Sequence, residues 1–500
     1  MIVRLLAAVA VLSAPAAALA EWQVAETQHF IIYSERSRAD IEKLAERVES
    51  YDRLMRMATS IPEDRDPVKV RIYELEDLGD IQKAANSDGG IGGFYDSNIL
   101  GPFLVAPRKT TGAIKEFTPE IVLHHEYAHH FMLQYFPAIY PGWYTEGFAE
   151  LIGSSKQLED GRIGYGMPAK GRGNEIAAYW VPLRELLVTE RPYALDTYGQ
   201  GWALTHFFTF NKERSAQLRQ YLYRLSSGKS LREAAQVFGD LNALNREARR
   251  YVTSGAFEYK PVKVEIARPV VRKIRGASAA EADLVPELAS FGDDDLSFIE
   301  KPGWRERARR FRERTLISIR NKVARHPGDA FGHYFLAEAE NAAGNFDRAE
   351  AAADRALAVQ PTHVRALARK SILLARRAGK LDGAARPAQA AEARRLATRA
   401  NRLDVEDPLP LVAFYESYRL AGEKPTPQAI LGLEKAVATY PLDMNIRQRL
   451  VDQMAADGRY AEAIALLQRI ANATHSSPRR SAARAQLAKL RAMLAAKQPT

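Results

Sequence analysis

The stretch from residue 121 to residue 150, IVLHHEYAHHFMLQYFPAIYPGWYTEGFAE, constrains the fold more than any other part of this 500-residue chain. Just before it, residues 118–120 read Thr-Pro-Glu: a hydroxyl to cap a helix, a proline for its first position and an acid for its first turn. The apolar residues that follow extend the expected helix to Phe136. We therefore expect the N-terminal part of the chain to be organised around this helix.

Two histidines of this helix, His125 and His129, are one turn apart and therefore lie on the same face. Both imidazoles can then bind one metal ion, each at about 2.0–2.1 Å. Glu126 lies beside that face, where a carboxylate can take a proton from a water that the ion activates. The pattern is HExxH, which is typical of zinc peptidases. The alternative is that both histidines are surface or core residues that match the pattern by chance.

A catalytic zinc ion needs a third protein ligand and one open position. We predict that the chain reverses between Pro137 and Gly142 and that Thr145 caps a second helix, EGFAELIG, which lies back along the first. Glu146 would then face the histidines from the opening turn and supply the third ligand. Glu150, one turn later on the same face, would accept a hydrogen bond from the outer nitrogen of a ligand histidine.

HExxH followed at Glu146 by Glu-Gly-Phe-Ala resembles the gluzincin metallopeptidases, the peptidase-MA-like group that includes the thermolysin and M1 aminopeptidase branches. The resemblance implies a mixed α/β, thermolysin-like domain with one Zn²⁺ per chain. It also implies that His125, His129 and Glu146 are the zinc ligands and that Glu126 is the catalytic base. The resemblance is specific over residues 118–210 and diffuse over 22–255.

A second motif, Tyr198-Gly-Gln-Gly at the start of an apolar helix that runs to Phe210, resembles the Tyr-Glu-Lys-Gly of M1 enzymes. By that resemblance Tyr198 stabilises the tetrahedral intermediate; the alternative is a core tyrosine. The chain departs from the M1 pattern at two places. Gln200 replaces the lysine, and the Gly-Gly-Phe-Tyr of residues 92–95 stands where a Gly-Ala-Met-Glu-Asn loop is expected. Aminopeptidase specificity therefore does not carry over.

Residues 1–20, MIVRLLAAVAVLSAPAAALA, have the early cation, the short apolar run and the Ala-Leu-Ala end of a secretory signal peptide. An N-terminal anchor helix is the alternative, but the apolar run is short and Pro15 interrupts it. No later segment approaches about 18 uninterrupted apolar residues, so we expect no membrane span. The expected location is the periplasm or the outside of the cell.

The chain has no cysteine, so disulfides are impossible and a metal site must use nitrogen and oxygen ligands. Its formal net charge is +10, or +9 once Arg4 is removed with the signal peptide. A basic chain suggests nucleic acid, but arginines alternate with glutamates, as in WRERARRFRER from residue 304, and form no clean basic stripe. We therefore expect no nucleic-acid partner. A solvated surface explains the charge, with anionic envelope polymers or acidic lipids as the alternative contacts.

Strands and helices alternate in residues 21–258, which we expect to be the metallopeptidase domain. Strand-like runs lie at 22–24, 29–33 and 68–73, with an amphipathic helix at about 38–57. In gluzincins an edge strand precedes the HExxH helix and pairs with the extended substrate, and by that resemblance residues 98–106 form this strand. Residues 259–302 are expected to be a linker or a small bridging module.

Residues 303–495 are expected to form a tetratricopeptide-repeat solenoid. Pro327 and Pro361 are 34 residues apart, which is the length of one repeat, and the Gly-x-Phe-x-x-Ala that starts at Gly344 recurs in similar form from Gly458. Three to five stacked helix pairs would make one right-handed solenoid with a concave groove for a protein partner. A generic helical bundle rich in Ala and Arg is the alternative.

The leading interpretation is an exported zinc metallopeptidase that cleaves a peptide or protein substrate and uses its repeats to bind a partner or substrate. An alternative from another class is a non-catalytic envelope adaptor with a structural zinc fold. Glu126 argues against it, because a structural site needs ligands and no base. A third interpretation is an enzyme that resembles the periplasmic proteases coupling HExxH to tetratricopeptide repeats in outer-membrane assembly. Those differ in the third-ligand segment, so only the layout is shared.

Overall fold

The computed structural model describes residues 21–63, 68–109, 118–136, 140–189, 198–227, 229–292, 296, 299, 301–441, 443–471 and 480–497. The expected signal peptide, residues 1–20, lies outside the described residues, and so do residues 137–139, which are half of the expected turn. Among the described residues, no helix has both the length and the apolar character needed to cross a membrane.

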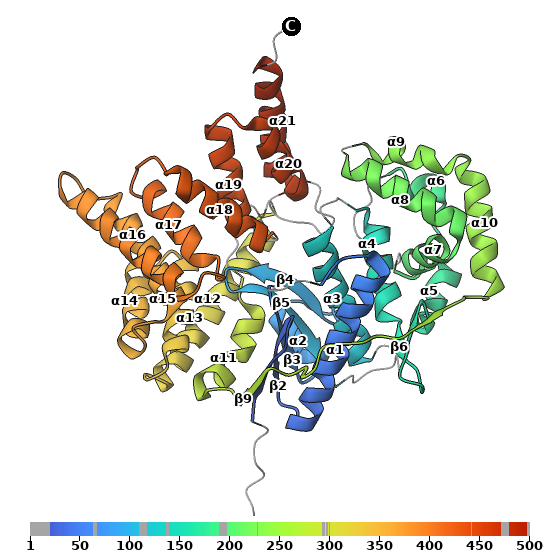
Figure 1. The fold of residues 1–500 in the computed structure, drawn as a ribbon, viewed down its shortest axis with the longest axis horizontal. Helices are drawn as coiled ribbons and strands as arrows, with labels where there is room; N and C mark the ends of the chain where they lie inside the picture. The colour runs from blue at the N-terminus through green and yellow to red at the C-terminus, as the bar shows by residue number, and fades with distance from the viewer. Residues whose placement is uncertain are drawn as a thin grey trace, which may run out of the picture.

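A six-stranded mixed sheet forms the centre of the N-terminal part, in the order β4-β5-β3-β2-β1-β9 (Figure 1). The central strands β2, β3 and β5 run parallel to one another, and β4, β1 and β9 each pair antiparallel with their neighbours. The strands are β1 (Gln23–Glu26), β2 (Phe30–Ser34), β3 (Val70–Leu75), β4 (Phe94–Asn98), β5 (Gly101–Pro107) and β9 (Lys273–Gly276).

Each face of this sheet packs against its own hydrophobic core. Along the central strands, successive apolar side chains point to opposite faces and therefore belong to different cores. Ile32, Ile72 and Leu104 are register partners on neighbouring strands and all face one core. Tyr33 and Tyr73, the next pair along, face the other core. A register shift of one residue would move each set to the wrong face, so the pattern fixes the pairing.

Three helices cover the first face: α1 (Arg38–Thr59), α3 (Pro119–Tyr135) and α4 (Gly142–Gly153). α1 and α3 lie where the sequence predicts them, within two residues at each end. The cap of α3 also forms as predicted, since the Thr118 hydroxyl accepts a hydrogen bond from the backbone N–H of Ile121 at 3.3 Å. The start of α4 was predicted wrongly. Its N-cap is Pro141, so Thr145 lies inside the first turns and caps nothing.

The predicted edge strand is also wrong, because residues 98–106 do not form one strand. β4 ends at Asn98, the chain turns, and β5 begins at Gly101, whose φ of +115° is in the region that favours glycine. β5 is paired on both sides, whereas β4 is the outer strand and contacts α3. Among the described strands, the edge next to the HExxH helix is therefore β4.

Residues 259–302 join the two halves of the chain through regular elements. β8 (Lys260–Val262) pairs with β7 (Ile163–Tyr165), in a small sheet with β6 (Lys156–Gln157), and β9 closes the large sheet beside β1. α11 (Ala279–Ser290) then packs on the second face of the large sheet, near α2 (Leu78–Ala84). Of the two interpretations of this segment, the contacts favour a bridging module over a linker. A domain boundary at residue 258 would remove β9 from its sheet.

The C-terminal part is a helical-repeat solenoid, as the 34-residue spacing predicts. Each helix packs on the next, and α15 also packs on α13 and on α17. The inner face of α14 carries only small residues, Ala349, Ala352, Ala353 and Ala356, and each is fully buried. The helices are α12 (Pro302–Arg325), α13 (Ala330–Ala342), α14 (Phe346–Val359), α15 (Val364–Ala378), α16 (Ala385–Leu403), α17 (Leu409–Arg419), α18 (Pro427–Thr439), α19 (Met444–Ala456), α20 (Tyr460–Ala471) and α21 (Arg480–Lys497).

The repeats and the large sheet share one hydrophobic core. Leu288 of α11 and Phe335 of α13 belong to the same cluster of buried side chains as Tyr73 of β3. Polar contacts cross the same boundary: Arg365 of α15 donates to the Leu100 carbonyl at 2.8 Å. The solenoid therefore begins as a layer on the sheet and not as a separate body.

Leu288→Ala tests this shared core. Leu288 is 1% exposed, so the substitution should lower the free energy of unfolding by about 2–5 kcal/mol. Amide hydrogen exchange should then accelerate in β2 and β3 and in α13 together. The matched control is Leu450→Ala in α19, a leucine that is 3% exposed in a separate core of the last repeats. Faster exchange in α13 alone would contradict a shared core.

Candidate metal centre

The centre is built by α3 and α4, which pack against each other on the first face of the sheet. α3 contributes His125 and His129, and α4 contributes Glu146. The two histidine Nε2 atoms are 3.1 Å apart. Glu146 Oε2 is 3.1 Å from Nε2 of His125, and Glu146 Oε1 is 3.2 Å from Nε2 of His129.

These distances fit a single metal ion. Ligand atoms at about 2.0–2.1 Å from a tetrahedral ion are about 3.3 Å from one another, close to the 3.1–3.2 Å found between these three side chains. Two imidazole nitrogens and one carboxylate oxygen are also the donor set of a catalytic zinc site. The three predicted ligands therefore come together, although Glu146 reaches the histidines from the second turn of α4 and not from its opening turn.

Glu150 lies behind His125, at the place predicted for a supporting carboxylate. Its Oε1 is 3.2 Å from Nδ1 of His125. Its two oxygens also accept hydrogen bonds from Arg172, at 2.7 and 3.1 Å. Burial disfavours the charged carboxylate, but the hydrogen bonds and charges of His125 and Arg172 lower the pKa of Glu150 to about 2. Glu150 is thus a fixed anion that orients His125.

The centre attracts positive charge. Burial disfavours the protonated form of His125, but the hydrogen bonds and charges of Glu146 and Glu150 raise the pKa of His125 well above its usual value. Burial likewise opposes the charge on Glu146, and His129 and His125 nevertheless lower the pKa of that carboxyl well below its usual range. The same negative charges would stabilise a divalent cation, which would replace the proton between the carboxylate and the imidazoles.

Glu126 lies beside the three ligands, next to the start of β4. Gly93 approaches so closely that a Cβ there would lie 2.5 Å from Val122 and 3.2 Å from Cγ of Glu126. The Gly-Gly-Phe-Tyr segment therefore brings the edge strand against the side chain that we predict to be the base. Burial raises the pKa of Glu126, and the charges of His125 and His129 oppose that rise.

Tyr198 reaches the centre on α7 (Tyr198–Phe210), which packs tightly on α4. A Cβ on Gly147 would lie 2.2 Å from the Gly201 carbonyl oxygen, and a Cβ on Gly201 would lie 2.6 Å from the Trp143 carbonyl oxygen. Only glycine at these two positions permits the approach. The packing brings the two sequence motifs together and places the Tyr198 ring 6.1 Å from the His125 ring, centroid to centroid.

The hydroxyl of Tyr198 stays protonated over the ordinary pH range, because burial and the nearby carboxylates raise its pKa. Arg172 lies over the same ring, with its guanidinium carbon 4.7 Å from the centroid. Gln200 faces elsewhere, since its amide exchanges two hydrogen bonds with the backbone of Val181, at 2.7 and 2.8 Å. Gln200 therefore holds the neighbouring segment around Val181 in place.

Arg172 is the residue of this centre that the sequence did not reveal. It connects Glu150, the ring of Tyr198 and Glu175, whose Oε1 is 2.6 Å from its Nη1. Glu175 in turn accepts from the backbone N–H of Gly199 at 3.1 Å. Arg172 is the last residue of a 3₁₀ turn (Lys170–Arg172) and directly precedes α5 (Gly173–Ala178). The stretch has no recognisable motif, so only the fold identifies this residue.

The remaining histidines near these helices have structural partners. His124 stacks on Tyr51, with ring centroids 3.3 Å apart, and His130 Nδ1 is 3.1 Å from the Tyr95 hydroxyl. His206 is fully buried between the Gly166 carbonyl and the Tyr251 hydroxyl. The helices after α7, which cover this side of the domain, are α8 (Lys212–Ser226), α9 (Leu231–Ala235) and α10 (Leu241–Ser254).

No protein-family model matches the chain, and no curated protein matches it either. Solved structures do. A thermophilic tetratricopeptide-repeat protein of Thermus thermophilus is 18% identical, with 40% of this chain and 100% of that chain covered and a TM-score of 0.32. A tetratricopeptide-repeat protein of Parabacteroides merdae is 12% identical, with coverages of 56% and 92% and a TM-score of 0.26.

Yeast Tom70 is 10% identical, with coverages of 74% and 69% and a TM-score of 0.26. Because all these TM-scores are low, the repeat architecture is assigned from the helix packing of this chain itself.

Proposed function

We propose that the chain is a zinc-dependent metallopeptidase of gluzincin type. The observation that supports this most is the triangle of His125, His129 and Glu146, whose ligand atoms lie 3.1–3.2 Å apart, with Glu126 beside it. When bound there, zinc would polarise a scissile carbonyl and lower the pKa of a water molecule toward about 7.

The chain's own residues supply the rest of the chemistry. Glu126 takes the proton of the attacking water and returns it to the leaving amine. Tyr198 donates a hydrogen bond to the oxyanion of the tetrahedral intermediate, which its raised pKa permits. Glu150 and Arg172 hold the His125 ring in position. No described strand pairs with the outer edge of β4, so this edge can pair with an extended peptide and present the peptide backbone to Glu126.

The repeats support a second function, the binding of a protein partner or of the substrate itself. Stacked helix pairs commonly offer an extended binding surface. If the metal triangle were only structural, the whole chain would be an adaptor of this kind. The solenoid favours this candidate, whereas Glu126 beside the ligands favours the enzyme. The N-terminal signal pattern supports a periplasmic or secreted location for either.

The direct test combines metal analysis with a peptide-library digest of the purified mature chain. We expect about one equivalent of zinc at the triangle and cleavage that stops when a chelator removes the metal and returns when zinc is restored. Zinc at the triangle without cleavage of any peptide or unfolded protein would favour the adaptor.

Tyr198→Phe tests the oxyanion donor. A hydroxyl that contacts the developing charge acts in the transition state and little in the ground state, so kcat should fall by about 10²–10³-fold with KM nearly unchanged. Zinc content should not change, because the ring can still stack under Arg172. A kcat within a few-fold of the parent enzyme would make Tyr198 a packing residue only.

A further inference from the structure

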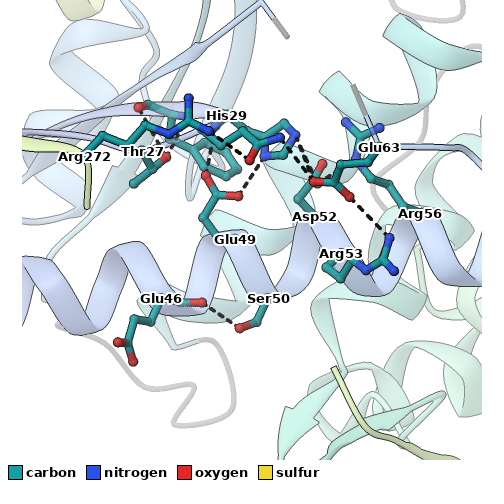
Figure 2. A network of polar contacts seen from close by, with 12 residues as sticks. Thr27, His29, Glu46, Glu49, Ser50, Asp52, Arg53, Arg56, Glu63 and Arg272 are labelled. Carbon is teal, nitrogen blue, oxygen red and sulfur yellow. Dashed lines mark hydrogen bonds and ion pairs between the residues drawn. The ribbon is translucent and has the colours of Figure 1, made fainter. Parts of the chain in front are cut away.

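A second group of metal-ligating side chains lies between the start of β2 and α1 (Figure 2). His29 directly precedes β2, Glu49 and Asp52 lie on α1, and Glu63 follows the end of that helix. The proposed catalytic centre uses none of these residues. Figure 2 shows the His29 ring between Glu49 on one side and Asp52 with Glu63 on the other.

The two ring nitrogens of His29 have different surroundings. Nδ1 is 2.7 Å from Glu49 Oε2, and the backbone N–H of the same residue donates to Glu49 Oε1 at 2.9 Å. This carboxylate holds the ring and favours the proton on Nδ1. Nε2 then carries the free electron pair, and it has no hydrogen-bond partner among the described residues although His29 is only 3% exposed.

Nε2 faces two carboxylates at distances too long for hydrogen bonds. Asp52 Oδ2 is 3.6 Å away and Glu63 Oε1 is 3.8 Å away. The three atoms all lie within 4.8 Å of one another. Ligand atoms that share a cation at about 2.0–2.3 Å are separated by roughly 3.3–3.8 Å. The two distances from Nε2 therefore fit ligand atoms that share one cation.

The charges around the gap between Nε2 and these two carboxylates also favour a bound cation. Glu49, Asp52 and Glu63 supply three negative charges. Two guanidiniums contact them: Arg56 Nε is 2.7 Å from Asp52 Oδ2, and Arg53 Nη1 is 3.3 Å from Glu63 Oε2. With His29 neutral, these groups keep one excess negative charge. A proton on Nε2 or a metal ion would offset that charge at the gap.

We propose that His29 Nε2, Asp52 and Glu63 form a second metal site, for a divalent transition-metal cation such as zinc or manganese. One imidazole and two carboxylates suit these ions, and the chain has no cysteine that would select softer ones. Glu49 orients the histidine, as supporting carboxylates do in metal sites.

This ion has a structural role. It ties the segment after α1 to the start of β2. Asp52 extends the connection to the HExxH helix, because its Oδ1 accepts a hydrogen bond from the Tyr127 hydroxyl at 2.7 Å. Tyr127 is the neighbour of Glu126 in the sequence. Occupancy should therefore stabilise the packing of α1 on α3.

The test isolates the second site by removing the first. The full-length variant His125→Ala/His129→Ala, reconstituted with zinc or manganese and dialysed, should retain about one equivalent of one of the two ions. The ion should raise its Tm by roughly 3–6 °C. Adding Glu63→Gln should abolish both the retained metal and the Tm shift. His29→Gln is the second variant, because glutamine keeps the polarity of the site and removes the ring nitrogen.

The matched control is Glu42→Gln, since Glu42 lies on α1 and its side chain is 45% exposed, as is that of Glu63. Adding Glu42→Gln to the double variant should change neither readout. If the folded double variant retains neither ion, or retains it equally after Glu63→Gln and His29→Gln, then a proton occupies the gap and the metal site does not exist. Because the first site is absent in these variants, this result is independent of whether the chain is a peptidase.

Discussion

Glu126→Gln should leave zinc bound at about one equivalent at the triangle and lower kcat for peptide hydrolysis by about 10²–10⁴-fold or more. The three ligand atoms belong to other side chains, so the amide does not disturb them. Glutamine has nearly the same shape as glutamate and fits beside Gly93, but it cannot accept the proton of the attacking water. Steady-state kinetics with a peptide substrate, together with metal analysis of the same preparation, measure both effects.

Glu120→Gln is the matched control for this variant, because Glu120 lies on the same helix and pairs with Arg47 at its first turn. Its kcat should stay within a few-fold of the parent value. If Glu126→Gln lost the metal, Glu126 would itself be a ligand. If it kept the metal and normal turnover, proton transfer would belong to another group and the proposed mechanism would be wrong.

The local part of this centre could be predicted from the sequence because helical geometry is periodic. The Thr-Pro-Glu start and the apolar run place α3 within one residue, and the HExxH spacing then puts two histidines on one face without further information. The same reasoning predicts the repeats, since stacking of small residues every 34 positions is also a local pattern. These predictions hold because each depends on contacts close in the sequence.

Predictions that depended on turns were less successful. Residues 98–106 contain no charged residue, but the chain turns at Gly101, which has a positive φ, and β4 becomes the outer strand. Thr145 has the right chemistry for a cap, but Pro141 precedes α4 and fits the extended backbone of an N-cap equally well.

Long-range partners outside the two motifs could not be predicted. Arg172 is 22 residues from Glu150, and β9 pairs with β1 across about half of the chain. His29 gives no local sign that Glu49, Asp52 and Glu63 will gather around it, because α1 must first fold back on β2. The close approach of Gly147 and Gly201 was not predicted either, although both glycines lie inside the two motifs and the contact leaves no room for a side chain at either position.

Glu146→Ala and Glu150→Ala should separate a ligand from its support. Glu146 is within 3.2 Å of both histidine Nε2 atoms, so its removal leaves two neutral imidazoles and should abolish stoichiometric zinc binding, and activity with it. Glu150 contacts only the outer nitrogen of His125 at 3.2 Å. Its removal should weaken zinc affinity by about 10–100-fold, because the ring loses the carboxylate that orients it.

Competition with a chelator of known affinity measures both effects on zinc binding, and a Glu63→Gln background prevents zinc at the second site from contributing to the titration. Glu150→Ala should regain activity when zinc is supplied in excess, whereas Glu146→Ala should not, since added zinc cannot replace a missing ligand. In Glu150→Ala, Arg172 keeps its hydrogen bond to Glu175, at 2.6 Å, and its position over the Tyr198 ring. The fold around the proposed oxyanion donor should therefore be preserved in this variant. Equal loss of zinc in both variants would mean that Glu150 can move onto the metal, and the third ligand would then be shared between the two glutamates.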